Sequence, residues 1–185
     1  MKIRPSTYSD IGTFRNFWDS ALAYQKARRL PLWPSFPESH VEAEIRAGLH
    51  FSSDFPNGVL AGYFSVALSD ALIWTGEERG DAIYIHRMCV NPSRKGSNLA
   101  RSVLAWSHGY ASSLGRQFVR MDTWADDQRL VDYYVRCGFQ HIGDRQLGDV
   151  TGLPPHYSNV RLALFQNAVD PLPPCCRDGR DVPKA

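Results

Sequence analysis

Residues 88–100 read Met88-Cys89-Val90-Asn91-Pro92-Ser93-Arg94-Lys95-Gly96-Ser97-Asn98-Leu99-Ala100, an apolar segment that meets a short polar turn and then a second apolar segment. The pattern predicts a strand that passes through the turn directly into a helix. Gly96, Ser97 and Asn98 allow a sharp turn, and the start of the helix offers unpaired N–H groups and the positive end of its dipole. Such a turn binds anions, so we expect a ligand that carries phosphate.

The chain has 185 residues and a formal net charge of +2. This length favours a single domain, which we expect to span residues 1–169. Residues 170–185 are rich in proline and poor in apolar side chains, and we expect them to form a mobile tail. The charge is too small, and the basic residues too scattered, to favour nucleic-acid binding, so we expect no nucleic-acid partner.

Cysteine spacing and hydropathy indicate in which cellular compartment the protein lies. Cys89, Cys137, Cys175 and Cys176 show no Cys-x-x-Cys spacing, so we expect reduced thiols and no metal site. The first five residues lack the apolar core of a signal peptide, and no apolar run approaches the length of a membrane span. We therefore expect a soluble, cytoplasmic protein without a membrane partner. A homodimer is compatible with the sequence, which does not determine the oligomeric state.

Apolar spacing and chain breakers predict the elements on both sides of the turn. Helices are predicted at residues 10–29, 38–48, 99–114 and 127–137. Strands are predicted at residues 2–5, 49–53, 59–68, 82–90, 118–124, 139–143 and 159–165. Asn57-Gly58 predicts a two-residue hairpin turn between the second and third strands, because both residues tolerate positive φ. The order indicates a mixed α/β protein, with a sheet covered by helices.

Two motifs follow one another along the chain. The first is Lys95-Gly96-Ser97-Asn98-Leu99-Ala100, after the strand at residues 82–90. The second begins at Asp122 and closes with Tyr134-Val135-Arg136-Cys137-Gly138-Phe139. Together they make residues 82–143 resemble the GNAT superfamily of acetyl-coenzyme A dependent N-acetyltransferases. Lys95 stands where this family usually has Arg or Gln, and Asn98 replaces a central glycine but is the best other residue for a left-handed turn.

The resemblance implies a GNAT-like fold, with a mostly antiparallel mixed sheet of about seven strands, a splayed central pair and about four flanking helices. It also implies acetyl-CoA as cosubstrate, between the strand ending at Val90 and the strand ending at Trp124. Backbone groups at Met88 and Val90 would pair with the pantetheine arm, and the amides of residues 95–100 would hold the pyrophosphate. The implied cofactor contacts are Met88, Cys89, Val90, Lys95, Gly96, Ser97, Asn98, Leu99, Ala100, Asp127 and Tyr134.

The resemblance further implies that Tyr134 is the tyrosine near the sulfur and acts as general acid toward the departing thiolate. Many members of the family carry a glutamate on the central strand, where this chain has Tyr84. His86 lies two residues further on, and hence on the same strand face. We interpret His86 as the candidate general base, because its ordinary pKa is near 6.5. Water remains the alternative base.

The expected activity is direct transfer of an acetyl group to a primary amine through a tetrahedral intermediate. The amine is not identified by the sequence, and small molecules and peptides both remain open. The alternative is a non-catalytic acyl-CoA-binding sensor or interaction module with the same fold. Three departures from the family pattern keep this alternative open. The strand glutamate is missing, Asn98 replaces a glycine, and Asp127 stands where the family usually has an asparagine that helps to hold the pantetheine.

Overall fold

The computed structural model of the protein describes residues 1–30, 32–149 and 151–169. The four α-helices in this part of the chain are α1 (Ile11–Arg28), α2 (Glu38–Arg46), α3 (Leu99–Ser113) and α4 (Gln128–Cys137). The strands are β1 (Lys2–Pro5), β2 (His50–Asp54), β3 (Leu60–Ala67), β4 (Ala82–Val90), β5 (Phe118–Trp124), β6 (His141–Gln146) and β7 (Arg161–Ala168). None of these helices is long and apolar enough to cross a membrane.

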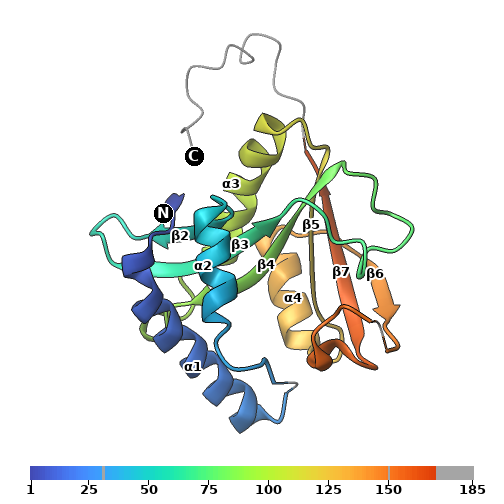
Figure 1. Ribbon diagram of the computed structural model, residues 1–185, viewed down its shortest axis with the longest axis horizontal. Coiled ribbons are helices and arrows are strands. Elements are labelled where there is room, and N and C mark those ends of the chain that lie inside the picture. Colours follow the sequence, from blue (N-terminus) through green and yellow to red (C-terminus); the bar gives the residue numbers. More distant parts are fainter. Residues whose placement is uncertain (31, 150, 170–185) are drawn as a thin grey trace.

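The strands form one sheet in the order β1-β2-β3-β4-β5-β7-β6 (Figure 1). Only β4 and β5 are parallel, because the chain crosses over through α3 between them; all other neighbours are antiparallel. The predicted mixed sheet of seven strands with four helices is therefore confirmed. The predicted tail at residues 170–185 lies outside the described residues.

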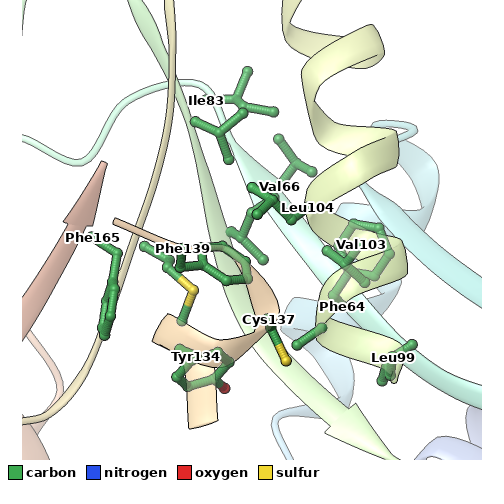
Figure 2. Close-up of a cluster of buried hydrophobic side chains, with 14 of the residues drawn as sticks. Phe64, Val66, Ile83, Leu99, Val103, Leu104, Tyr134, Cys137, Phe139 and Phe165 are labelled. Atoms are coloured by element: carbon green, nitrogen blue, oxygen red, sulfur yellow. The ribbon is translucent and has the colours of Figure 1, made fainter. Parts of the chain in front are cut away.

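Successive residues of β4 face two different layers of helices. Ile83 and Ile85 pack with Val103 of α3 and Tyr134 of α4 in one buried cluster, which Figure 2 shows. We call this side of the sheet the α3/α4 face. Tyr84 alternates with the isoleucines and lies on the opposite side, which we call the α1/α2 face because it carries those two helices.

A β-bulge interrupts this alternation in β4. Ser65 pairs with His86 and Tyr63 pairs with Cys89, so that β4 has two residues where β3 has one. Arg87 takes a left-handed conformation there, with φ of 51°. It donates a 2.8 Å hydrogen bond to Ser65 Oγ and forms an ion pair with Glu44 of α2, which hold the bulge in place.

The parallel pairing of β4 with β5 is short. It joins Ala82–Ile85 to Phe118–Met121 and ends there, although both strands continue. β5 stays paired with β7 as far as Trp124, whereas β4 stays paired with β3 as far as Val90. The two central strands therefore part after Ile85 and Met121.

Three local predictions were wrong. The hairpin between β2 and β3 is not a two-residue turn: Gly58 N–H donates to Phe55 O, and only Gly58 has positive φ. Pro56 sets φ for the first corner of a turn that spans residues 55–58, so the loop is longer than predicted.

Strand β6 begins at His141 instead of Phe139, because the Phe139 N–H donates to Tyr134 O and so belongs to the end of α4. Strand β7 begins at Arg161, two residues later than predicted, after Asn159 with φ of 53°.

A buried histidine links pH to the stability of this fold. His50 is 1% exposed and packs against the rings of Phe14 and Tyr63, with centroid distances of 4.9 and 5.4 Å. Its Nδ1 shares a 2.9 Å hydrogen bond with Ser6 Oγ. Burial, with a smaller contribution from the charge of Arg87, lowers the pKa of His50 to about 4.

We predict that the free energy of unfolding falls as the pH drops from about 6.5 toward 4, because the unfolded chain then protonates His50 and the folded chain does not. The loss from this group reaches about 3 kcal/mol. Asp122 has the opposite effect over the same pH range: burial raises its pKa to about 6, so the folded chain takes up this proton before the unfolded chain does. Its protonation therefore raises the free energy of unfolding as the pH falls. Urea unfolding of the wild type and of His50→Phe at about pH 7.5 and 4.5 separates the two groups, because Asp122 titrates in both proteins. If the free energy of unfolding fell equally in both proteins between about pH 7.5 and 4.5, His50 would not be the source of the pH dependence.

Gly62 permits the close approach of β3, β4 and α3. A Cβ atom at this position would overlap the carbonyl oxygen of Cys89 and the side chain of Leu99, the first residue of α3. We predict that Gly62→Ala lowers the free energy of unfolding by about 1–3 kcal/mol. Gly109→Ala is the matched control, since nothing lies within 4 Å of that position in α3, and it should raise stability. A Gly62→Ala protein as stable as the wild type would show that the approach is not tight.

Candidate active site

The turn before α3 has the geometry of an anion site. Gly96 and Asn98 have φ of 80° and 58°, both left-handed, and Asn98 is the residue that precedes the helix. The Ser97 hydroxyl is buried and has no hydrogen-bond partner among the described residues. An unpaired buried hydroxyl beside the free amides of a helix start favours a polar ligand at this position.

A cavity of about 230 Å³ opens between this turn and α4. Its lining combines both predicted motifs: Met88, Val90, Lys95, Gly96, Ser97, Leu99, Ala100, Leu130, Tyr133 and Tyr134. Eight of the predicted cofactor contacts therefore line one cavity: five before α3, the first two residues of α3, and Tyr134. Asn98 shapes the turn without lining the cavity.

Cys89 and Asp127, two further predicted cofactor contacts, do not line this cavity; Asp127 instead lines a second, larger one. The bulge turns the Cys89 side chain to the α1/α2 face, where it packs with α1, so only its backbone faces the neighbouring strand. Burial raises the pKa of the Cys89 thiol to about 12, which keeps it an unreactive thiol. Asp127 caps α4 by accepting a 3.2 Å hydrogen bond from Leu130 N–H, so this carboxylate is already partly occupied.

A second cavity, of about 930 Å³, lies where β4 and β5 part. Side chains from both faces of the sheet line it. Ile85, Met88, Met121 and Tyr134 reach it from the α3/α4 face. From the other face it is lined by His86, Asp122, Trp124 and Tyr157, with Trp18 and Tyr24 of α1 and Trp33 of the following loop as a wall. The gap between the two strands therefore connects the two faces of the molecule.

Tyr134 lines both cavities. It is held edge-on against the rings of Phe139 and Phe165, with centroid distances of 5.6 and 5.8 Å, at the margin of the core cluster in Figure 2. Burial raises the pKa of Tyr134 far above its ordinary value. The phenol is therefore protonated at neutral pH and able to donate a hydrogen bond into the cavity.

His86 belongs to a group of three titratable side chains. The β4–β5 register would place Asp122 opposite His86, one step beyond the last pair, and so the two residues face each other where the strands separate. Asp70, from the loop after β3, completes the group: its Oδ2 lies 3.4 Å from His86 Nε2. One ligand atom from each of the three residues lies within 4.8 Å of the others.

Tyr84 and two tryptophans separate into core and cavity. Tyr84, at the position of the family glutamate, is fully buried and its hydroxyl accepts a 2.9 Å hydrogen bond from Arg120, so it does not reach the cavity. Trp74 is buried against Tyr84, whereas Trp33 lines the cavity. Sequence reasoning missed Asp70 and Asp122. Asp122 could have been found from the parallel register, but nothing in the polar loop distinguishes Asp70.

Comparisons with known proteins identify the family. A model of the Acetyltransferase (GNAT) family matches residues 16–139. Uncharacterized N-acetyltransferase YesJ of Bacillus subtilis (strain 168) is 28% identical over 74 residues, which cover 40% of this chain and 41% of that protein. The match thus spans about two-fifths of the curated relative.

Solved structures show the same fold. A GNAT-family acetyltransferase from Listeria monocytogenes is similar with a TM-score of 0.66 and 20% identity, covering 90% of this chain and 94% of its own. The acetyltransferase yncA from Salmonella typhimurium, solved with acetyl-CoA, has a TM-score of 0.65 and 18% identity, covering 92% of this chain and 94% of its own. Spermidine N-acetyltransferase from Vibrio cholerae, in complex with CoA and spermine, has a TM-score of 0.63 and 13% identity, covering 91% of this chain and 95% of its own. At these identities the similarity concerns the fold alone. Because the family model covers most of the sequence and the fold agrees, the chain belongs to the acetyltransferase (GNAT) family, whose members use acetyl-CoA as acyl donor.

Proposed function

We propose that this protein transfers the acetyl group of acetyl-CoA directly to a primary amine. The observation that carries the proposal is the cavity that passes through the sheet between β4 and β5. It extends from Met88 and Tyr134, which also line the smaller cavity beside the anion turn, to His86 on the other face, so that donor and acceptor can approach the same point from opposite sides. Neighbouring folds solved with acetyl-CoA, or with CoA and spermine, support this assignment.

The donor binds along β4 and the turn that follows it. Past Ile85, no strand among the described residues pairs with β4 on the side of β5, so the β4 backbone can pair with the pantetheine arm near Met88 and Val90. The pyrophosphate would rest on the amides of residues 95–100, near the unpaired Ser97 hydroxyl. A backbone amide at Met88 or Val90 would hold the thioester oxygen as it gains negative charge.

The chemistry needs one base and one proton donor. An ammonium ion gives one proton to His86 Nε2, and the neutral amine nitrogen then bonds to the thioester carbon. When the tetrahedral intermediate collapses, the carbon–sulfur bond breaks and the thiolate receives a proton through the Tyr134 hydroxyl, which regains one from the acylated nitrogen. The products are an amide, CoA and one proton that leaves His86 for solvent. Water serves as base in the alternative route.

We predict that Tyr134→Phe lowers kcat at least about a hundredfold, the usual scale of a lost proton donor, with less than about a twofold change in the Kd of acetyl-CoA. Tyr110→Phe on α3 is the matched control, because it makes the same change in a half-buried tyrosine that lines neither cavity. Release of free CoA thiol in the presence of an amine panel measures the rate. Unchanged turnover of Tyr134→Phe would remove Tyr134 from the mechanism.

The same assay separates the enzyme from a non-catalytic acyl-CoA-binding module. An enzyme releases CoA thiol only when an amine is added. Tight binding of acetyl-CoA without amine-dependent release of thiol, over a broad panel of amines, would favour the module. The cytoplasm, where thiols are reduced, remains the compartment that we propose; Cys89 and Cys137 are both free and buried.

We predict that Ser97→Glu raises the Kd of CoA at least about tenfold, because it places a carboxylate where the pyrophosphate would lie. Ser93→Glu is the control: it adds the same charge at an exposed position of the same connection, outside both cavities. Isothermal titration calorimetry with CoA measures both. An equal Kd in the two variants would place the phosphates elsewhere.

A further inference from the structure

The cluster formed by Asp70, His86 and Asp122 is poised to hold a cation. The Asp70 side chain is only 10% exposed, and its Oδ2 is buried without a hydrogen-bond donor among the described residues. A buried carboxylate oxygen that lacks a donor is costly, and a second carboxylate nearby adds repulsion. A cation between the two acids would relieve both costs.

The guanidinium groups nearest to this cluster along β4 and β5 are already engaged. Arg87 pairs with Glu44 and donates to Ser65 Oγ. Arg120 donates hydrogen bonds to the Tyr84 hydroxyl and the Glu77 carbonyl, and its Nη1 lies 3.4 Å from Asp81 Oδ1. Among the described residues, no lysine or arginine forms an ion pair with Asp70 or Asp122, and the group within ion-pair distance of Asp70 is His86, at 3.4 Å. The two acids can therefore still receive a cationic ligand.

His86 and Asp122 of this cluster line the larger cavity, and Asp70 lies beside His86 without lining it. Aromatic side chains form much of the remaining wall. Trp124 packs against Tyr157 with a centroid distance of 5.7 Å, and Trp18 packs against Trp33 at 4.5 Å. The loop that carries Trp33 is fixed to α1, because Trp18 Nε1 donates to Pro34 O at 2.9 Å. Such walls favour a planar, apolar body, since they offer large rings to stack on.

We propose that the acceptor is a primary amine carried on an aromatic group, with its ring among Trp33, Trp124 and Tyr157. Its ammonium ion is held at Asp122, which lines the cavity, and is stabilised by the charge of the neighbouring Asp70. The inference rests on the proposed function and names the substrate class of that site. His86 then stands 3.4 Å from Asp70, where it can take the ammonium proton. An α-carboxylate on the acceptor would sit two bonds from the nitrogen, close to the two acids, and is disfavoured by repulsion.

Calorimetry on the full chain, saturated with CoA, tests this with four ligands: 2-phenylethylamine, 2-phenylethanol, L-phenylalanine and spermidine. The amine should bind at least about tenfold more tightly than each of the others. Asp70→Asn should raise the Kd of 2-phenylethylamine at least about tenfold but that of 2-phenylethanol less than about twofold, since the alcohol has no charge. Asp122→Asn should act in the same direction. Asp132→Asn, on the exposed side of α4, should change neither.

Three results would overturn the inference. The first is an equal loss of amine and alcohol binding in Asp70→Asn, which would make Asp70 a structural residue; an unchanged Kd of CoA in this variant shows that it folds. The second is tighter binding and faster acetylation of L-phenylalanine or spermidine. The third is stoichiometric binding of Zn²⁺ or Mg²⁺ by the cluster with turnover lost in EDTA, which would make it a metal site.

Failure of the inference is distinguishable from failure of the proposed function. If another amine of the panel releases CoA thiol while 2-phenylethylamine neither binds nor reacts, acetyl transfer stands and the substrate class is wrong. If no amine releases thiol although acetyl-CoA binds, the proposed function is wrong. Binding of 2-phenylethylamine that depends on Asp70 would still support the cation site in that case.

Discussion

The parallel pairing of β4 and β5 ends after Ile85 and Met121, and the rest of the site depends on this termination. The strands separate because each follows a different neighbour. β4 is bulged at Arg87 and continues with β3, under an ion pair with Glu44 of α2. β5 continues straight along β7 to Trp124. Had the register continued, backbone hydrogen bonds would close the sheet and leave no passage between its faces.

The separation gives each face of the molecule a different chemical character. The α3/α4 face supplies a helix start, an unpaired hydroxyl at Ser97 and a protonated phenol at Tyr134, which suit a phosphate-bearing donor and a leaving thiolate. The α1/α2 face supplies the acids Asp70 and Asp122, His86 and aromatic walls, which suit a cationic acceptor. Opposite charges on the two ligands thus match the two cavities, which meet at Tyr134, and this complementarity would orient the reaction.

Much of this fold could be predicted from the sequence, because it depends on local patterns. Apolar periodicity predicted the observed bounds of β4 and β5, and the helix predicted at residues 127–137 agrees with α4 to within one residue. The bulge could not be predicted, because it is stabilised by Glu44 and Ser65, which are far from Arg87 along the chain. For the same reason the sequence placed Cys89 at the cofactor, whereas the bulge turns its side chain toward α1.

The candidate site was predictable only where one motif contains its residues. The turn at residues 95–100 and Tyr134 belong to such motifs, and the structure brings them to one cavity. Asp70 meets His86 only because a loop after β3 folds over the sheet, and a loop of this kind carries no periodic signal. His86 was found from its ordinary pKa and its strand position, but its partners came from the tertiary structure.

The central claim is that acetyl-CoA lies in the gap between β4 and β5, along β4 and on the turn before α3. The most direct measurement is a titration of the ¹⁵N-labelled protein with acetyl-CoA, observed through its backbone amide resonances. The account predicts the largest shifts at the amides of Met88, Val90 and residues 96–100, with smaller shifts around Tyr134. Unchanged amides in this stretch, with the shifts gathered on β1 and β2 or on β6, would contradict it.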